Sequence, residues 1–224
     1  MRLQIKPLFF GIAVLFSTAS HSLEFAKKHI DGKDILLLYG PFEHGDSQSF
    51  SRAVHQAGRI DEIWFDSPGG IVTEGLKIGR EIHASNLATR IPRGAKCNSI
   101  CTFAFLGGVV RDIDPNTKYG VHMFSAWCDE ERGKALFMAI VELIKRYGCT
   151  LKGVATLAGS IIDLIQEQEK NSALTAKMQV DYLLEMQVSL RFLLPNYEKG
   201  QACAETYNLS RQQLKSFNVI NTID

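Results

Sequence analysis

The sequence predicts an α/β fold whose C-terminal part is mostly helical. Up to residue 124, short apolar runs alternate with segments of helical spacing, a pattern typical of a parallel sheet covered by helices. Farther along, Leu136, Ile140 and Leu143 recur at the spacing of one helix face. A chain of 224 residues, 46% of them apolar, is long enough for one domain with a buried core.

The expected strands are short apolar runs that end at turn residues. They cover residues 35–39, 60–65, 87–91, 109–113 and 119–124. Helices of the first part are expected at 46–57, where Asp46 offers a cap, at 74–83 and at 99–106. Later helices are expected at 136–147, at 161–168, at 173–188 and after Ser210.

The first 22 residues have the order of a secretory signal peptide. A basic start is followed by an uncharged apolar stretch at 8–16. Ser20 and Ser22 then place small residues at the minus-three and minus-one positions that a signal peptidase recognises. The apolar stretch is shorter than the roughly 20 residues that span a bilayer. We expect cleavage before Leu23, which leaves residues 23–224 as a single periplasmic or secreted domain. The alternative is an uncleaved membrane anchor.

Charge and cysteine content narrow the classes of partner. The formal net charge is +1 and there is no long basic run, so electrostatics give no case for nucleic acid or for an anionic membrane surface. An odd count of five cysteines leaves at least one unpaired within the chain in an oxidising compartment. Cys97 and Cys101 have no further His or Cys at metal-ligand spacing. We expect neither a metal nor a cofactor.

Two turns carry residues suited to acyl-transfer chemistry. In Asp66-Ser67-Pro68-Gly69-Gly70, paired glycines let backbone N–H groups face a site and stabilise an oxyanion, although an ordinary strand–turn–helix junction explains the same residues. In Cys97-Asn98-Ser99-Ile100-Cys101, Ser99 opens an expected helix, whose N-terminal field favours negative charge on the serine oxygen. The alternative is that Ser99 only caps that helix.

His122 lies near the end of the last expected strand of the first part. From there its imidazole can reach a serine on a neighbouring element and transfer a proton. A lone histidine on an apolar strand is also common as a core residue. The order and spacing of the two turns and His122 together favour a nucleophile and its base.

Residues 65–72, the Ser99 turn and His122, in this order, resemble the Clp protease proteolytic-subunit family. They are most similar to its exported bacterial members, which pair this glycine turn with a Cys-x-Ser-x-Cys turn. The likeness runs over residues 35–124 and returns weakly at 208–219. The resemblance implies a crotonase-like fold, a spiral of β-β-α units, and hydrolysis of peptide bonds through an acyl-serine without a cofactor.

The resemblance also implies roles for single residues. Ser99 would be the nucleophile and His122 the general base, and the N–H groups of Gly70 and Ile100 would form the oxyanion hole, with Gly69 shaping the turn. The substrate would be a peptide or an unfolded protein that pairs with backbone near the glycine turn as an added strand.

Two departures from the family affect these expectations. The position that matches the family's triad acid holds Thr206, with Glu205 beside it. A carboxylate is needed there only to orient and stabilise the imidazole, so Glu205 is the candidate, whereas no spacing argument supports Asp163 or Asp181. The alternative is a Ser–His dyad without an acid. The segment after His122 is longer than in the family, where this region makes the contacts that close rings. The family's rings are therefore not expected to carry over, although a homo-oligomer of another kind is still compatible with the sequence. Export would separate the chain from ATP-driven unfoldases, and no ATPase partner is expected.

The cysteines and the activity each leave alternatives. Cys97 and Cys101 either form a disulfide that braces the nucleophile turn or are two small buried residues. The leading function is an ATP-independent serine peptidase. The main alternative is a catalytically inactive binding or scaffold protein on the same fold, and a further one is an enzyme that acts on a thioester.

Overall fold

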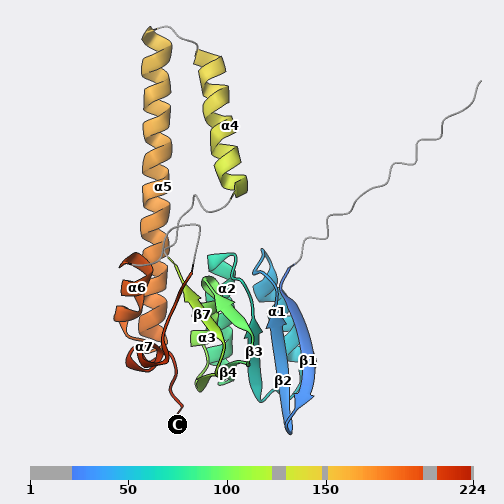
Figure 1. Cartoon of the computed structure of the whole chain (residues 1–224). Helices are drawn as coiled ribbons and strands as arrows, with labels where there is room; N and C mark the ends of the chain where they lie inside the picture. Colours follow the sequence, from blue (N-terminus) through green and yellow to red (C-terminus); the bar gives the residue numbers. More distant parts are fainter. Residues whose placement is uncertain (1–21, 123–129, 148–150, 199–205, 223–224) are drawn as a thin grey trace, which may run out of the picture.

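The computed structural model describes residues 22–122, 130–147, 151–198 and 206–222, and its architecture is mixed α/β (Figure 1). The larger sheet has the strand order β1-β2-β3-β4-β6. Its members are β1 (Glu24–Ile30), β2 (Lys33–Tyr39), β3 (Glu62–Asp66), β4 (Ala88–Ile91) and β6 (Arg111–Ile113). β1 is antiparallel to β2, and the other pairs are parallel.

A second, smaller sheet is joined to the first. It contains β5 (Lys96–Asn98), β7 (Lys118–Val121) and β8 (Tyr207–Asn208), in the order β5-β7-β8. β5 is parallel to β7, and β8 is antiparallel to it. A bridge between Ser67 and Cys97 links the end of β3 to β5. The two sheets therefore meet at the glycine turn and the Ser99 turn.

Three helices lie in the α/β part, and a long helical hairpin extends from it (Figure 1). The first three are α1 (Asp46–Ala57), α2 (Val72–Ala84) and α3 (Ile100–Leu106). The hairpin consists of α4 (Glu130–Tyr147) and α5 (Leu151–Glu185), and a 3-10 turn (Leu190–Leu193), α6 (Leu194–Glu198) and α7 (Arg211–Ser216) follow. Within the described ranges, no helix is long and apolar enough to cross a membrane.

The close approach of α2 and α3 sets the position of the segment that begins α3. Glycines line this contact: a Cβ on Gly75 would lie 2.4 Å from Ile100 Cγ1, and a Cβ on Gly107 would lie 2.0 Å from the carbonyl oxygen of Gly79. All seven residues of α3 are buried. A short helix that is apolar on every side is stable because it is enclosed on every side.

The last turns of α5 contact both α3 and α2. The Tyr182 hydroxyl donates a hydrogen bond of 2.8 Å to the carbonyl oxygen of Phe103, and the Phe103 ring also packs edge-on against Phe192. Arg80 of α2 forms an ion pair with Glu185 at the end of α5. The C-terminal end of α5 is therefore part of the core, whereas its earlier turns pair with α4.

Several observed elements differ from the expected ones. The helices expected at 161–168 and 173–188 form one helix, α5, because the polar residues between them include no Gly or Pro that would end it. β1 was not expected because its charged residues suit an exposed sheet edge and hide the apolar alternation of a strand. The strand expected at 119–124 ends at Val121, and residues 123–124 lie outside the described ranges.

Gly107 offers a test of the contact between α2 and α3. Gly107→Ala should lower the free energy of unfolding by about 1–3 kcal/mol, because the new Cβ would overlap the Gly79 carbonyl. Gly159→Ala on α5, with nothing within 4 Å of its Cβ, should instead raise it by about 0.5–1 kcal/mol. Urea unfolding of both variants measures this, and equal effects would show that the contact is looser than described.

Glu74 gives the fold a defined dependence on pH. Burial raises the pKa of its carboxyl, but hydrogen bonds from Ser47 and Lys77 outweigh burial and lower the pKa from 4.5 to about 2. Because the folded state has the lower pKa, this stabilisation is complete above the ordinary pKa and is lost as the pH falls toward 2. It amounts to roughly 3 kcal/mol.

Replacing Glu74 should therefore make the free energy of unfolding depend less on pH in the acid range. In urea titrations from about pH 6 to about pH 2, Glu74→Gln should lose less stability on acidification than the native chain. Glu169→Gln, which changes an exposed carboxyl on α5, is the matched control and should follow the native curve. If Glu74→Gln also follows the native curve, the hydrogen bonds from Ser47 do not carry the effect.

Candidate active site

Ser99 lies at the junction of β5 and α3 in a strained backbone conformation. Its φ is 56° and its ψ is −128°, which side chains with a Cβ seldom adopt. Such a conformation costs about 1–3 kcal/mol and persists only where its surroundings hold it. Here the Ser99 N–H donates to the Gly120 carbonyl at 2.8 Å, and the Ser99 carbonyl accepts from the N–H of Thr102 at 3.0 Å.

The Ser99 hydroxyl is not used to cap α3. The side chain makes no capping hydrogen bond, so the interpretation of Ser99 as a simple helix cap is wrong. Instead Ser99 lines a small open pocket of about 320 Å³, counted with the space open to solvent. A sharp strand-to-helix turn that exposes a serine in this way is typical of nucleophilic serines.

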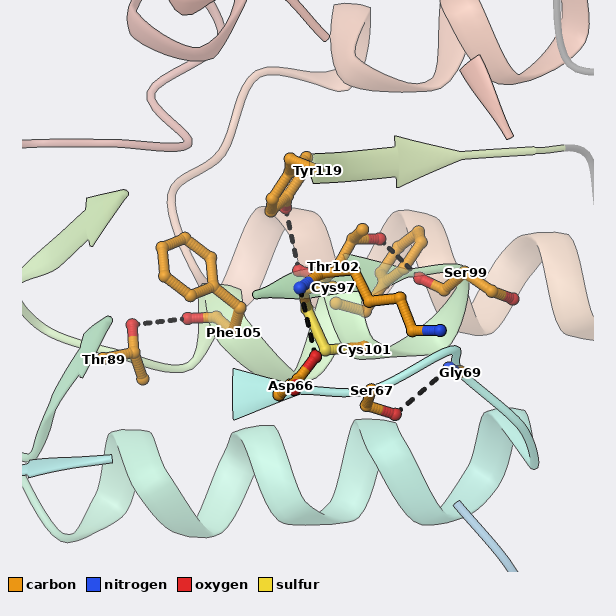
Figure 2. The surroundings of a disulfide bond; sticks show 12 residues. Asp66, Ser67, Gly69, Thr89, Cys97, Ser99, Cys101, Thr102, Phe105 and Tyr119 are labelled. Atoms are coloured by element: carbon orange, nitrogen blue, oxygen red, sulfur yellow. Dashed lines mark hydrogen bonds between the residues drawn. A yellow bond between two sulfur atoms is a disulfide. The ribbon is translucent and has the colours of Figure 1, made fainter. Parts of the chain in front are cut away.

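The glycine turn at Gly69 and Gly70 lies against Ser99. The Ser67 N–H donates to the Lys96 carbonyl at 2.7 Å, which ties this turn to β5. The Ser67 hydroxyl accepts from the Gly69 N–H at 3.1 Å (Figure 2). A Cβ on Gly69 would lie 2.5 Å from Ser99 Cβ, so glycine is needed for this close approach.

Two backbone N–H groups near Ser99 are available to a ligand. Phe42 pairs with Gly70 in a parallel bridge, in which the Phe42 N–H donates to the Gly69 carbonyl and the Phe42 carbonyl accepts from Ile71. In that pattern the N–H of Gly70 faces away from Phe42. Ile100 is the first residue of α3, where N–H groups lack helical partners. Neither N–H has a hydrogen-bond partner among the described residues.

His122 follows β7 and lines the same pocket as Ser99. β5 and β7 are parallel neighbours with Asn98 opposite Gly120, so Ser99 and His122 both lie at the carboxyl ends of adjacent strands. His122 is half-buried and is engaged in an interaction of its own. The structure shows no hydrogen bond between the imidazole and the Ser99 hydroxyl. Catalytic hydrogen bonds are often long in ligand-free enzymes and tighten when substrate binds.

The remaining pocket residues are apolar or uncharged. They are Val72, Ile100, Thr102, Phe103, Val121 and Gln179. Among these described pocket residues, His122 is thus the one with an imidazole that could act on the Ser99 hydroxyl.

Sequence reasoning missed Gln179. This side chain comes from α5, far along the chain from the two turns, and it is buried. The signal was present in the sequence, because Thr175, Gln179 and Tyr182 place two polar residues on an otherwise apolar helix face. These polar residues can be assigned to the site only once the structure shows that Gln179 of α5 lines the same pocket as Ser99.

A disulfide joins Cys97 to Cys101 across the Ser99 turn (Figure 2). The two Cα atoms are 5.2 Å apart, and both side chains are buried. One cysteine lies in β5 and the other in the first turn of α3, so the covalent link holds both ends of the strained segment. Closing so short a loop restricts the unfolded chain by roughly 2 kcal/mol.

The position expected for a triad acid is close to His122. β8 pairs with β7 so that Tyr207 lies opposite Val121, and extending this register by one residue puts Thr206 opposite His122. Asn98 and Thr206 lie over Gly120: a Cβ there would be 2.4 Å from Asn98 Oδ1 and 2.6 Å from Thr206 Oγ1. The neighbouring Glu205 lies outside the described residues.

Other charged groups considered for the site lie elsewhere. Asp163 and Asp181 are on α5 and do not line the pocket, and Asp181 is paired with Lys177. Among the residues that the structure describes, no three His, Cys, Asp or Glu side chains converge as metal ligands would.

Comparisons with known proteins add little to this geometry. No family model matches the chain, and no curated protein does. Among solved structures, the chain is similar to a mutant of the 1510-N membrane-bound stomatin-specific protease, with 18% sequence identity and a TM-score of 0.34. The match covers 54% of this chain and 65% of that one. A likeness at this level supports no argument about function, which depends on the site itself.

Gly69→Ala tests how tightly the two turns fit together. The substitution should cost about 3 kcal/mol of the free energy of unfolding, because a left-handed φ and the contact with Ser99 both oppose a Cβ. Gly94→Ala, which also has a positive φ but no atom within 4 Å, should cost only about 1–2 kcal/mol. Urea unfolding distinguishes the two; equal costs would place Ser99 farther from Gly69 than described.

Proposed function

We propose that this protein is an exported serine hydrolase that cleaves peptide bonds through an acyl-serine intermediate. One observation carries the proposal. Ser99 lies in a strained turn, its hydroxyl makes no capping hydrogen bond to α3, and it shares a pocket with His122 at the ends of adjacent parallel strands. The resemblance to the Clp protease proteolytic subunits and their crotonase-like fold is part of the same proposal. The two sheets, whose parallel strands lead into the glycine turn and the Ser99 turn, are compatible with it.

The acylation step follows from the positions of these groups. The His122 imidazole takes the proton of the Ser99 hydroxyl while the serine oxygen attacks the substrate carbonyl carbon. The N–H groups of Gly70 and Ile100 donate to the oxyanion that forms. The imidazolium then gives its proton to the leaving amine, the C–N bond breaks, and an ester of Ser99 remains.

Deacylation reverses the roles with water. His122 takes a proton from water, the hydroxide attacks the ester carbonyl, and Ser99 leaves as the alcohol after regaining its proton. A carboxylate that orients the imidazole would strengthen both steps. Glu205, which precedes Thr206 in the sequence, is the proposed candidate, and without it the pair acts as a dyad.

The substrate is proposed to be an extended peptide or an unfolded protein. Gly70 is exposed, and its N–H and carbonyl face away from Phe42, which leaves an edge on which an added strand can pair. Because the pocket is small and largely apolar, a short uncharged side chain fits next to the scissile bond. Export through the N-terminal leader would let the enzyme act without ATP or an unfoldase.

A binding or scaffold function on the same fold is the second candidate. It is favoured by Thr206, which takes the position expected for the triad acid but has no carboxylate to orient the imidazole. In that case the pocket would hold a peptide end or side chain without cleaving it.

A fluorophosphonate probe, which reacts only with activated serines, distinguishes these functions. The native chain should be labelled at Ser99, and Ser99→Ala should abolish labelling. His122→Ala should slow it by about 100-fold or more, because general base catalysis is lost. Ser216→Ala and His55→Ala, both exposed and remote, are the matched controls and should be labelled like the native chain.

The outcome assigns the function directly. Labelled peptide mapping by mass spectrometry must identify Ser99 for the hydrolase proposal to stand. A folded native chain that stays unlabelled, with the disulfide either intact or reduced, would favour the binding protein instead.

A further inference from the structure

Asp46 is a buried carboxylate that receives the backbone N–H of Leu23. Asp46 is only 4% exposed and Leu23 only 3%, and Asp46 Oδ2 accepts from the Leu23 N–H at 3.2 Å. The same oxygen accepts from the N–H of Glu43 at 2.6 Å. Asp46 is the first residue of α1, not its cap as expected, because the cap position is taken by Gly45.

Within the described part of the chain, no Lys, Arg or His pairs with Asp46. Buried carboxylates are costly unless a positive group compensates them. The field of the α1 N-terminus supplies only part of that compensation.

We propose that removal of the leader before Leu23 supplies the missing cation. Hydrolysis of the Ser22–Leu23 peptide bond by a signal peptidase consumes one water and leaves a carboxylate on Ser22 and an ammonium on Leu23. The amide nitrogen that already contacts Asp46 becomes that ammonium, so the neutral hydrogen bond turns into a buried ion pair. The Leu23 side chain, part of the hydrophobic core, keeps the new N-terminus in place.

The ion pair acts on the glycine turn through a short segment. Asp46 holds the N–H of Glu43, and the preceding residue, Phe42, donates its N–H to the Gly69 carbonyl at 2.8 Å. Gly69 in turn contacts Ser99. Maturation therefore fixes the segment that positions the oxyanion turn. The inference rests on the proposed export of the chain and does not depend on the chemistry of Ser99.

The full chain, exported by a bacterial host and purified from its periplasm, provides the test. Intact mass should show Leu23 as the first residue. Asp46→Asn is then compared in the native chain and in a chain with one alanine inserted between Ser22 and Leu23, which is cleaved at the same point but carries its ammonium one residue earlier. Urea unfolding gives the equilibrium constant for all four proteins.

Asp46→Asn should raise the unfolding constant at least about tenfold more in the native chain than in the insertion chain. The N–H of Phe42 should also exchange its hydrogen more slowly in the native chain. Another first residue, an equal effect of Asp46→Asn in both chains, or equal exchange at Phe42 would overturn the proposal.

A chemical measurement decides the matter if Asp46→Asn fails to fold. Free α-amines are methylated reductively faster than lysines because their ordinary pKa is lower, roughly 8 against roughly 10. In the native exported chain, the Leu23 amine should react more slowly than the exposed Lys28, and in the insertion chain the new amine should react faster. A fast-reacting Leu23 amine contradicts the pair. No readout uses Ser99, so failure here is distinguishable from failure of the hydrolase proposal.

Discussion

The parallel pairing of β5 with β7 is the constraint on which the candidate site depends. It places Asn98 opposite Gly120, and the hydrogen bond from the Ser99 N–H to the Gly120 carbonyl continues the pairing past the end of β5. Ser99 and His122 are separated in sequence by α3, β6 and β7, yet both follow strands of the same small sheet. Without this pairing neither the strained turn nor the shared pocket would form.

Several independent contacts hold the strain at Ser99. The disulfide between Cys97 and Cys101 links its two flanks, and α2 packs closely on α3 through glycines. α5 adds a hydrogen bond from Tyr182 to α3, and its Gln179 lines the same pocket as Ser99. Because these contacts come from several elements, packing of the core compensates the unfavourable backbone energy at Ser99. Strained residues that are held in this way are common at functional sites.

Local sequence patterns predicted the turns that glycine marks better than the short strands. The resemblance, and not the local pattern, implied that the glycine turn after β3 shares a site with the Ser99 turn, and the structure shows Gly69 against Ser99. The three residues of β5 and the two of β8 carry too little pattern to be detected, since pairing with β7 stabilises them more than their own composition does. The same limit hid Gln179, whose position depends on the path of α5.

The sequence by itself determined the mixed α/β order of the first part, the helical second part, and the turns that carry Ser99, Gly69 and Gly70. These follow from periodicity and from the conformations that glycine and proline allow, which are local properties. Only the tertiary structure decided that the Ser99 side chain makes no capping hydrogen bond to α3, that Ser99 and His122 share a pocket, and that Asp46 is buried against Leu23. Such facts depend on distances between segments far apart in the chain, which local pattern does not encode.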